Sequence, residues 1–263
     1  MSRAADIHAL SNSQSRASGS DAACPPLGYF QKSQAPLHSL LLLLPLVILY
    51  EAGTTYFATD AKHHTEQRIL AFQIMQQFFI WFGAKGRYLP ACAVCAILLS
   101  WHIARRDSWE IDWMTEIGMV FESLFWSLPL IFLDALSSHY IPMIGGHGHW
   151  STMLVMSLGA GVYEELVFRL ALFSLLNLLI VDLLRTPHRY AIPLMVLLSG
   201  LTFSLYHYWR GAEPFSTHTF VFRTSAGIYF SLLFFWRGFG ITSGCHAAYD
   251  LIAVTRMIMV GVA

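Results

Sequence analysis

The segment GAGVYEELVFR, residues 159–169, determines how this sequence is interpreted, because it places charged side chains inside a long apolar run. Two adjacent carboxylates, Glu164 and Glu165, are followed four positions later by the guanidinium of Arg169. Inside a membrane each of these charges costs roughly 3 kcal/mol or more unless it is paired or faces a wet cavity. We therefore expect the rest of the chain to form a scaffold in which these charges are tolerated and used.

The composition of the whole chain is that of a polytopic membrane protein. Of its 263 residues, 56% are hydrophobic and only 12% are charged, whereas about 25% of the residues are charged in a typical soluble domain. The formal net charge is zero and no basic block occurs, so nothing in the sequence favours nucleic-acid binding. Four scattered cysteines are too few for a disulfide scaffold.

Long apolar runs predict an all-α transmembrane helical bundle with seven to eight spans and an intramembrane polar site. The clear runs cover residues 40–58, 88–104, 117–136, 152–184, 190–209, 220–236 and 239–260. A further run at 69–84 carries three glutamines and is short for a span, so it could lie at the interface, re-enter the membrane or cross it. The distribution of Lys and Arg over the loops leaves the orientation in the membrane open.

The chain divides into a tail and a membrane domain. Residues 1–38 lack an apolar core and are predicted to form a disordered tail, and residues 39–263 form the multi-pass domain. The first apolar run comes too late and is too long for a cleaved signal peptide. The run at 152–184 is longer than a span requires, and we expect Gly159 and Gly161 to divide it into two pieces.

Helical spacing predicts an ion pair within the opening segment. Side chains four residues apart share one face of a helix, so Glu165 and Arg169 can neutralise each other. Glu164 then remains as the acid without a cationic partner. The other intramembrane acids are expected to serve helix packing or to lie at the interface; they are Glu51, Glu122, Asp134 and Asp182.

Two later helices each carry a histidine that shares a face with a second side chain. Phe203 lies beside His207, and Asp250 can orient His246 or accept its proton. The helix that starts near Glu164 leaves one membrane face, and the helix that ends near His207 returns to that face. His246 and Asp250 fall towards the middle of the last span, so all four groups could converge on one polar site.

These residues form three motifs in a fixed order, which are Glu164-Glu165-x-x-x-Arg169, Phe203-x-x-x-His207 and His246-x-x-x-Asp250. They resemble the CPBP family of intramembrane proteases, which includes the Rce1-like type II CAAX prenyl endopeptidases and the bacterial Abi proteins. The resemblance covers about residues 150–263, which would be the protease core. The family more often has asparagine where this chain has Asp250, and the extra carboxylate could change the pH dependence.

The resemblance implies an intramembrane endopeptidase that hydrolyses a peptide bond of a membrane-associated protein substrate. Glu164 would be the general base that activates a water, and His207 would position that water or stabilise the oxyanion. His246 and Asp250 would complete the polar site. The residues that support the site structurally would be Glu165, Arg169 and Phe203.

Two alternatives remain open at this stage beside the glutamate mechanism, which uses no cofactor. One glutamate, two histidines and an aspartate could ligate zinc, although the His-Glu-x-x-His spacing of many zinc proteases is absent. A non-catalytic partner, such as a bacteriocin-immunity or assembly factor, could keep the same fold. In every case the chain is expected in the lipid bilayer as an integral multi-pass protein, in the plasma membrane if it is bacterial.

Overall fold

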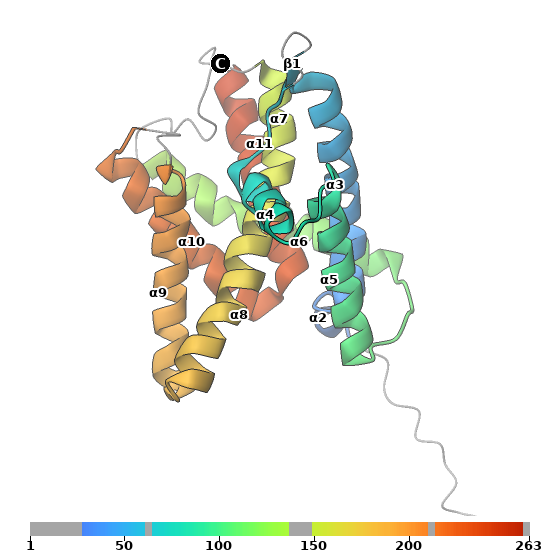
Figure 1. The fold of residues 1–263 in the computed structure, drawn as a ribbon, viewed down its shortest axis with the longest axis vertical. Coiled ribbons are helices and arrows are strands. Elements are labelled where there is room, and N and C mark those ends of the chain that lie inside the picture. The colour runs from blue at the N-terminus through green and yellow to red at the C-terminus, as the bar shows by residue number, and fades with distance from the viewer. Residues whose placement is uncertain (1–27, 61–64, 137–148, 210–213, 260–263) are drawn as a thin grey trace, which may run out of the picture.

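The computed structural model describes residues 28–60, 65–136, 149–209 and 214–259 of the chain. These residues form a bundle of helices, and the predicted all-α fold is confirmed apart from one short antiparallel ladder between β1 (Thr59–Asp60) and β2 (Thr65–Glu66). Figure 1 shows the arrangement of the helices. Along the first half of the chain they are α2 (Tyr29–Lys32), α3 (Pro36–Phe57), α4 (Leu70–Trp81), α5 (Leu89–Arg105) and α6 (Trp113–Leu136). The second half contains α7 (Trp150–Gly159), η1 (Ala160–Glu164), η2 (Leu166–Ala171), α8 (Leu172–Leu176), η3 (Asn177–Leu183), α9 (His188–Tyr206), α10 (Thr217–Arg237) and α11 (Phe239–Met259).

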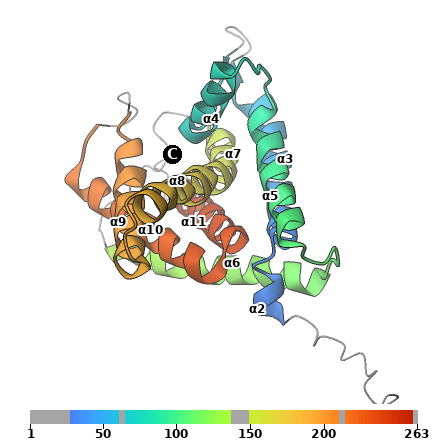
Figure 2. The same cartoon turned by 60° about the horizontal axis from the view of Figure 1, so that its bottom comes forward.

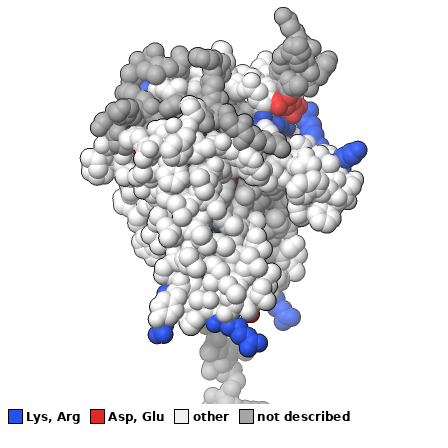
Figure 3. Space-filling view, turned by 60° about the vertical axis from the view of Figure 1, so that its left-hand side comes forward, with Lys and Arg blue, Asp and Glu red and all other residues white. Residues whose placement is uncertain are grey.

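Several of these helices are long and apolar enough to cross a membrane. Within the described residues five helices meet that condition, namely Pro36–Phe57, Trp113–Leu136, Trp150–Leu183, His188–Tyr206 and Thr217–Arg237. The helix α5 is apolar but shorter. Figure 3 shows a broad face that is largely without Lys, Arg, Asp or Glu and has charged side chains towards its two ends. The chain is an integral multi-pass membrane protein.

The helix α11 occupies the centre of the bundle. It packs against α3, α6, α7, η1 and α10, and Figures 1 and 2 show it enclosed by these elements. Every residue from Phe239 to Asp250 is buried. This position explains why α11 can carry polar residues, since its first half faces other helices and not lipid.

The glutamine-bearing run forms α4, which is too short to cross the membrane alone. Its 12 residues extend over about 18 Å, whereas the hydrocarbon core is about 30 Å thick. Large side chains at its carboxyl end, Trp81 and Phe82, are 75% and 74% exposed. Aromatic residues of this kind favour the membrane interface, so we infer that α4 lies there or enters without crossing.

The predicted division of the long run at its glycines is wrong. Residues Trp150–Leu183 form one continuous helix, in which the hydrogen bonding changes from α-helical to π-helical at Ala160. The glycines allow close packing: a Cβ at Gly161 would lie 2.6 Å from the backbone nitrogen of Ala247, and one at Gly159 would lie 2.3 Å from the ring of Tyr50. Sequence alone does not distinguish a glycine that breaks a helix from one that allows a neighbouring helix to pack closely against it.

Gly161→Ala is expected to lower stability by about 1–3 kcal/mol, the usual cost of overpacking a dense interior. The added methyl group meets the backbone of α11 at Ala247, which cannot rotate away as a side chain could. Thermal unfolding of the purified protein in detergent measures the effect. The matched control is Gly28→Ala, because a Cβ there meets no atom within 4 Å. Equal melting temperatures for both variants would contradict this account of Gly161.

The ordered bundle begins earlier than the predicted tail boundary at residue 38. The side chains of Ser33 and His38 are 0% and 4% exposed. Arg237 donates a hydrogen bond from Nη2 to Ser33 Oγ over 2.8 Å, and Nδ1 of His38 lies 2.7 Å from a carboxylate oxygen of Glu116. Individual polar contacts hold this segment against the helices of the bundle. Its low hydrophobicity therefore wrongly indicated a disordered tail up to residue 38. Residues 1–27 lie outside the described part of the chain.

Three of the acids expected to serve helix packing or to lie at the interface form ion pairs with arginines, which the sequence did not predict. Asp134 Oδ2 lies 3.1 Å from Nη1 of Arg256, and Glu122 accepts a hydrogen bond from Nη2 of Arg237 over 2.7 Å. The third acid, Glu51, lies 2.8 Å from Nη1 of Arg68. Each pair neutralises a carboxylate that would otherwise be costly inside the membrane domain.

Candidate functional site

The four residues predicted to form the catalytic site line one cavity of ≈ 500 Å³. They come from three separate stretches of helix, since Glu164 ends η1, His207 follows α9, and His246 and Asp250 lie on α11. The convergence predicted from chain direction is therefore present in the structure. The wall of the cavity also includes Met156, Phe203, Tyr206, Arg223, Phe230 and Tyr249.

Glu164 is held beside a phenol and an imidazole. Its side chain is buried, and Tyr206 donates a hydrogen bond from Oη to Glu164 Oε1 over 3.3 Å. The second carboxylate oxygen, Oε2, lies 3.9 Å from Nε2 of His246, which is too long for a direct hydrogen bond.

Glu165 binds two partners at once. Its Oε2 lies 3.0 Å from Nε of Arg169, and both side chains are 0% exposed, so the predicted ion pair is present. Its Oε1 lies 2.7 Å from Nδ1 of His246. The second contact joins residues 81 positions apart, and no local pattern in the sequence indicated it.

The contact with Glu165 fixes the ring of His246. A carboxylate accepts hydrogen bonds, so Nδ1 of His246 carries a proton and donates it to Glu165. The ring also stacks on Phe230, with centroids 4.5 Å apart and an interplanar angle of 20°. Its other nitrogen, Nε2, lies 3.5 Å from Asp250 Oδ2. His246 thus presents Nε2 to the carboxylates of Glu164 and Asp250.

Arg169 is enclosed by groups that tolerate a buried cation. Besides Glu165, it donates a hydrogen bond from Nη2 to the carbonyl oxygen of Gly227 over 3.1 Å. The guanidinium carbon lies 4.8 Å from the ring centroid of Phe203 and 5.3 Å from that of Phe230. Aromatic faces attract a guanidinium, and Phe203 also contacts the ring of His207.

The tautomer of His207 follows from its backbone contact. Its Nδ1 lies 2.8 Å from the carbonyl oxygen of Phe203, and a carbonyl oxygen can only accept. Nδ1 therefore carries the proton, and Nε2 of the neutral ring has a lone pair. In this state His207 can accept a hydrogen bond from a water but has no second proton to donate to an oxyanion.

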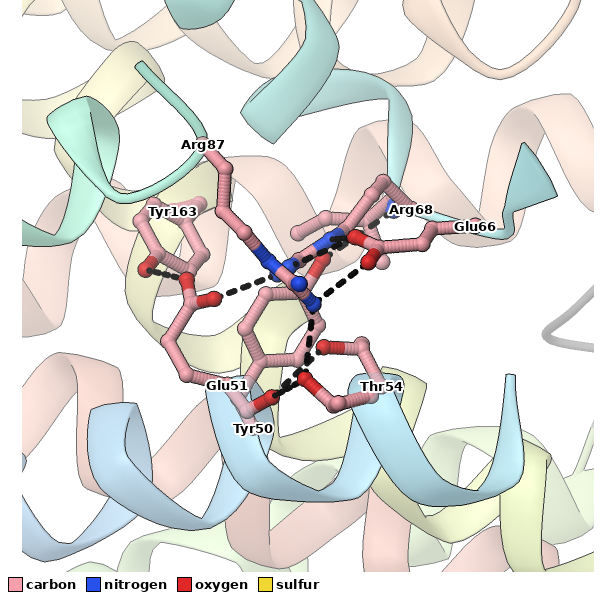
Figure 4. Close-up of polar contacts among 9 residues, drawn as sticks. Tyr50, Glu51, Thr54, Glu66, Arg68, Arg87 and Tyr163 are labelled. Carbon is pink, nitrogen blue, oxygen red and sulfur yellow. Dashed lines mark hydrogen bonds and ion pairs between the residues drawn. The ribbon is translucent and has the colours of Figure 1, made fainter. Parts of the chain in front are cut away.

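The end of β2 and the segment that leads from it to α4 form another wall of the cavity, lined by Glu66 and Arg68. Figure 4 shows how Arg68 bridges this segment to α3, with Nη1 on Glu51 and Nη2 3.0 Å from Glu66. Burial alone would lower the pKa of Arg68, but the hydrogen bond and charge of Glu51 outweigh it and raise the pKa above its usual value. Tyr163, next to Glu164 in sequence, donates to Glu51 over 3.3 Å.

Sequence reasoning missed several residues that surround the candidate catalytic groups. Tyr206 immediately precedes His207, and its role as a donor to Glu164 could have been suspected from that position. Arg223 is a charged residue within the apolar helix α10. A charge inside an apolar run is also the feature that drew attention to Arg169. Arg223 belongs to none of the three motifs and was therefore overlooked.

The donor set was also compared with the needs of a metal ion. Among the residues that the structure describes, no group of three or more His, Cys, Asp or Glu is placed to hold a metal. The ring of His246 is engaged at Nδ1 by Glu165, which leaves one nitrogen for any other partner. Whether a metal takes part is tested by the chelation experiment described below.

Comparison with known proteins gave one finding. Residues 145–252 match the family described as type II CAAX prenyl endopeptidase Rce1-like. The matched region contains all three motifs, from Glu164 to Asp250. No curated protein and no solved structure matched the chain.

Proposed function

We propose, from the match of residues 145–252 to the Rce1-like family of type II CAAX prenyl endopeptidases, that the chain is a member of this family in which Glu164 activates the water that hydrolyses the substrate. The family makes it an integral membrane protease of the CAAX type, which acts on membrane-associated proteins. The mechanism proposed here is that of a glutamate-dependent endopeptidase, which needs no metal or other cofactor.

One observation carries the proposal, namely that Glu164 lines the same cavity as His207, His246 and Asp250. Its neighbour Glu165 is engaged by Arg169 and His246. Glu164 instead lies beside the phenol of Tyr206 and the imidazole of His246, so its carboxylate is the one suited to accept a proton. A general base must lie within hydrogen-bond reach of the water that it deprotonates, and the cavity beside Glu164 has room for one.

In the proposed reaction, a water sits between Glu164 and Nε2 of His207. Its oxygen attacks the scissile carbonyl carbon, forming a C–O bond, while one proton passes to the carboxylate of Glu164. The carbonyl π electrons move to oxygen and create an oxyanion. When the oxyanion collapses, the C–N bond breaks and the departing amine takes the proton from Glu164. The products are a carboxyl terminus and an amine, and the enzyme is regenerated.

In this mechanism the supporting residues hold the catalytic side chains in position. Glu165 orients His246 through Nδ1, and the ring in turn borders both Glu164 and Asp250. A histidine held in this way can gain or lose a proton and so change the net charge of the site during the reaction. Arg169, which packs on the ring of Phe203, holds Glu165 in position.

A proteomic comparison tests whether the chain is a protease at all. Membrane fractions of cells producing the wild-type protein or Glu164→Gln are compared for the carboxyl termini of their proteins. We expect a set of shortened membrane-associated proteins that appears only with the wild-type chain. Identical termini in both samples would favour a non-catalytic partner that keeps the family fold.

Cleavage by the purified wild-type protein is expected to continue at an unchanged rate in a strong chelator, because the proposed mechanism uses only side chains and water. The assay follows an internally quenched farnesylated CAAX peptide in liposomes before and after treatment with 1,10-phenanthroline. Loss of activity that is restored by added zinc would instead establish the zinc-dependent version of the protease.

A further inference from the structure

The proposed hydrolysis requires a donor for the oxyanion, and the motif residues offer few. Preorganised donors aimed at the developing negative charge often supply the largest part of catalysis. The proton of His207 is at Nδ1 and is used on the carbonyl oxygen of Phe203. Nδ1 of His246 is used on Glu165, and its Nε2 faces the carboxylates of Glu164 and Asp250. A further positive group is therefore needed beside the scissile carbonyl.

Arg223 meets this requirement by its position. It lies on α10, its side chain is 3% exposed, and it lines the same cavity as Glu164 and His207. Its guanidinium carbon lies 6.0 Å from the ring centroid of Tyr208. A guanidinium is always charged and carries five N–H donors, so it can interact with the walls of the cavity and still reach an oxygen within it.

The surrounding charges agree with such a role. Arg223 lines the same cavity as Glu164, Asp250 and His207, so its positive charge acts on all three groups at short range. Two acids in one cavity favour a buried cation beside them. The same cation disfavours a second positive charge on His207, which keeps that ring neutral and its Nε2 able to accept a hydrogen bond from the water.

We propose that Arg223 is a further catalytic residue, which stabilises the oxyanion formed when the water attacks the scissile carbonyl. The inference rests on the proposed function of the site. As the C–O bond forms and the water proton moves to Glu164, the electron pair of the carbonyl moves to oxygen, where the guanidinium donates hydrogen bonds to it. When the C–N bond breaks, that electron pair returns and the contact weakens.

Arg223→Met and Arg223→Lys test this assignment with the farnesylated CAAX peptide in liposomes. Arg223→Met is expected to lower kcat by about 100- to 1000-fold with little change in KM, the usual effect of removing an oxyanion donor. Arg223→Lys keeps the charge and should recover part of the loss. The matched control is Arg189→Gln, since Arg189 is exposed and does not line the cavity.

A second readout separates stabilisation of the oxyanion from a structural effect. A phosphinic peptide, in which PO2–CH2 replaces the scissile CO–NH group, carries a fixed negative charge where the oxyanion forms. If Arg223 contacts the oxyanion, the dissociation constant of this analogue rises in each variant by the factor by which kcat/KM falls. If Arg223→Met does not fold, Arg223→Lys decides the question by the same two measurements.

Wild-type kcat and wild-type phosphinate affinity in a folded Arg223 variant would overturn the assignment. The proposed function is judged separately, by Glu164→Gln in the same assay. An inactive Glu164→Gln together with a fully active Arg223→Met would retain the glutamate mechanism and remove Arg223 from it. An active Glu164→Gln would reject the mechanism itself.

Discussion

Arg169→Met is expected to destabilise the protein by about 3–5 kcal/mol, the cost of breaking a buried ion pair by removing one partner. The methionine leaves the carboxylate of Glu165 buried with only His246 as a partner. It also removes the hydrogen bond to the carbonyl oxygen of Gly227 and the contacts with two aromatic rings. Unfolding of the purified protein in mixed micelles measures the loss.

Two further variants test whether the loss of stability arises because the ion pair is buried. Glu165→Gln combined with Arg169→Met should recover part of the lost stability, because no uncompensated charge then remains in the interior. Arg256→Met removes an ion pair with Asp134 in which the two side chains are 39% and 12% exposed, so it should cost clearly less than Arg169→Met, whose pair is 0% exposed. Equal losses for Arg169→Met and Arg256→Met would contradict the importance of burial.

Local sequence spacing was sufficient to predict contacts within one helix. The pair of Glu165 and Arg169 follows from a separation of four residues, and so does the approach of His246 to Asp250. The membrane class followed from composition for a similarly direct reason, since lipid requires long apolar helices whatever their arrangement. Both kinds of inference use information that a short window of sequence contains.

Contacts between distant helices could not be predicted in the same way. The hydrogen bond between Glu165 and His246 depends on α11 passing beside η1, and the close approach at Gly161 is what allows it. The change to π-helical turns at Ala160 was also unforeseen. A π-helical turn holds more residues than an α-helical one, so adjacent side chains lie closer together around the axis and both glutamates can face the interior.

Glu164→Gln is expected to lower kcat by about 100- to 10,000-fold, the usual contribution of a general base. The amide has nearly the shape of the carboxylate, and its oxygen can still accept the hydrogen bond from Tyr206. It cannot take a proton from water. The substitution should therefore remove catalysis while the melting temperature stays close to that of the wild type.

Asp182→Asn is the matched control for that substitution. Asp182 lies on the same continuous helix, is exposed and does not line the cavity. Its replacement also removes one negative charge by an exchange of acid for amide, so a general effect of charge on the helix would appear in both variants. We expect wild-type kcat and KM for Asp182→Asn.

The rate of cleavage by Glu164→Gln, measured beside the wild type in the same liposomes with the farnesylated CAAX peptide, tests the central claim most directly. The glutamate mechanism predicts that the folded variant binds the peptide but cleaves it at least about 100-fold more slowly than the wild type. Cleavage at the wild-type rate by a folded Glu164→Gln protein would contradict the assignment of Glu164 as the base.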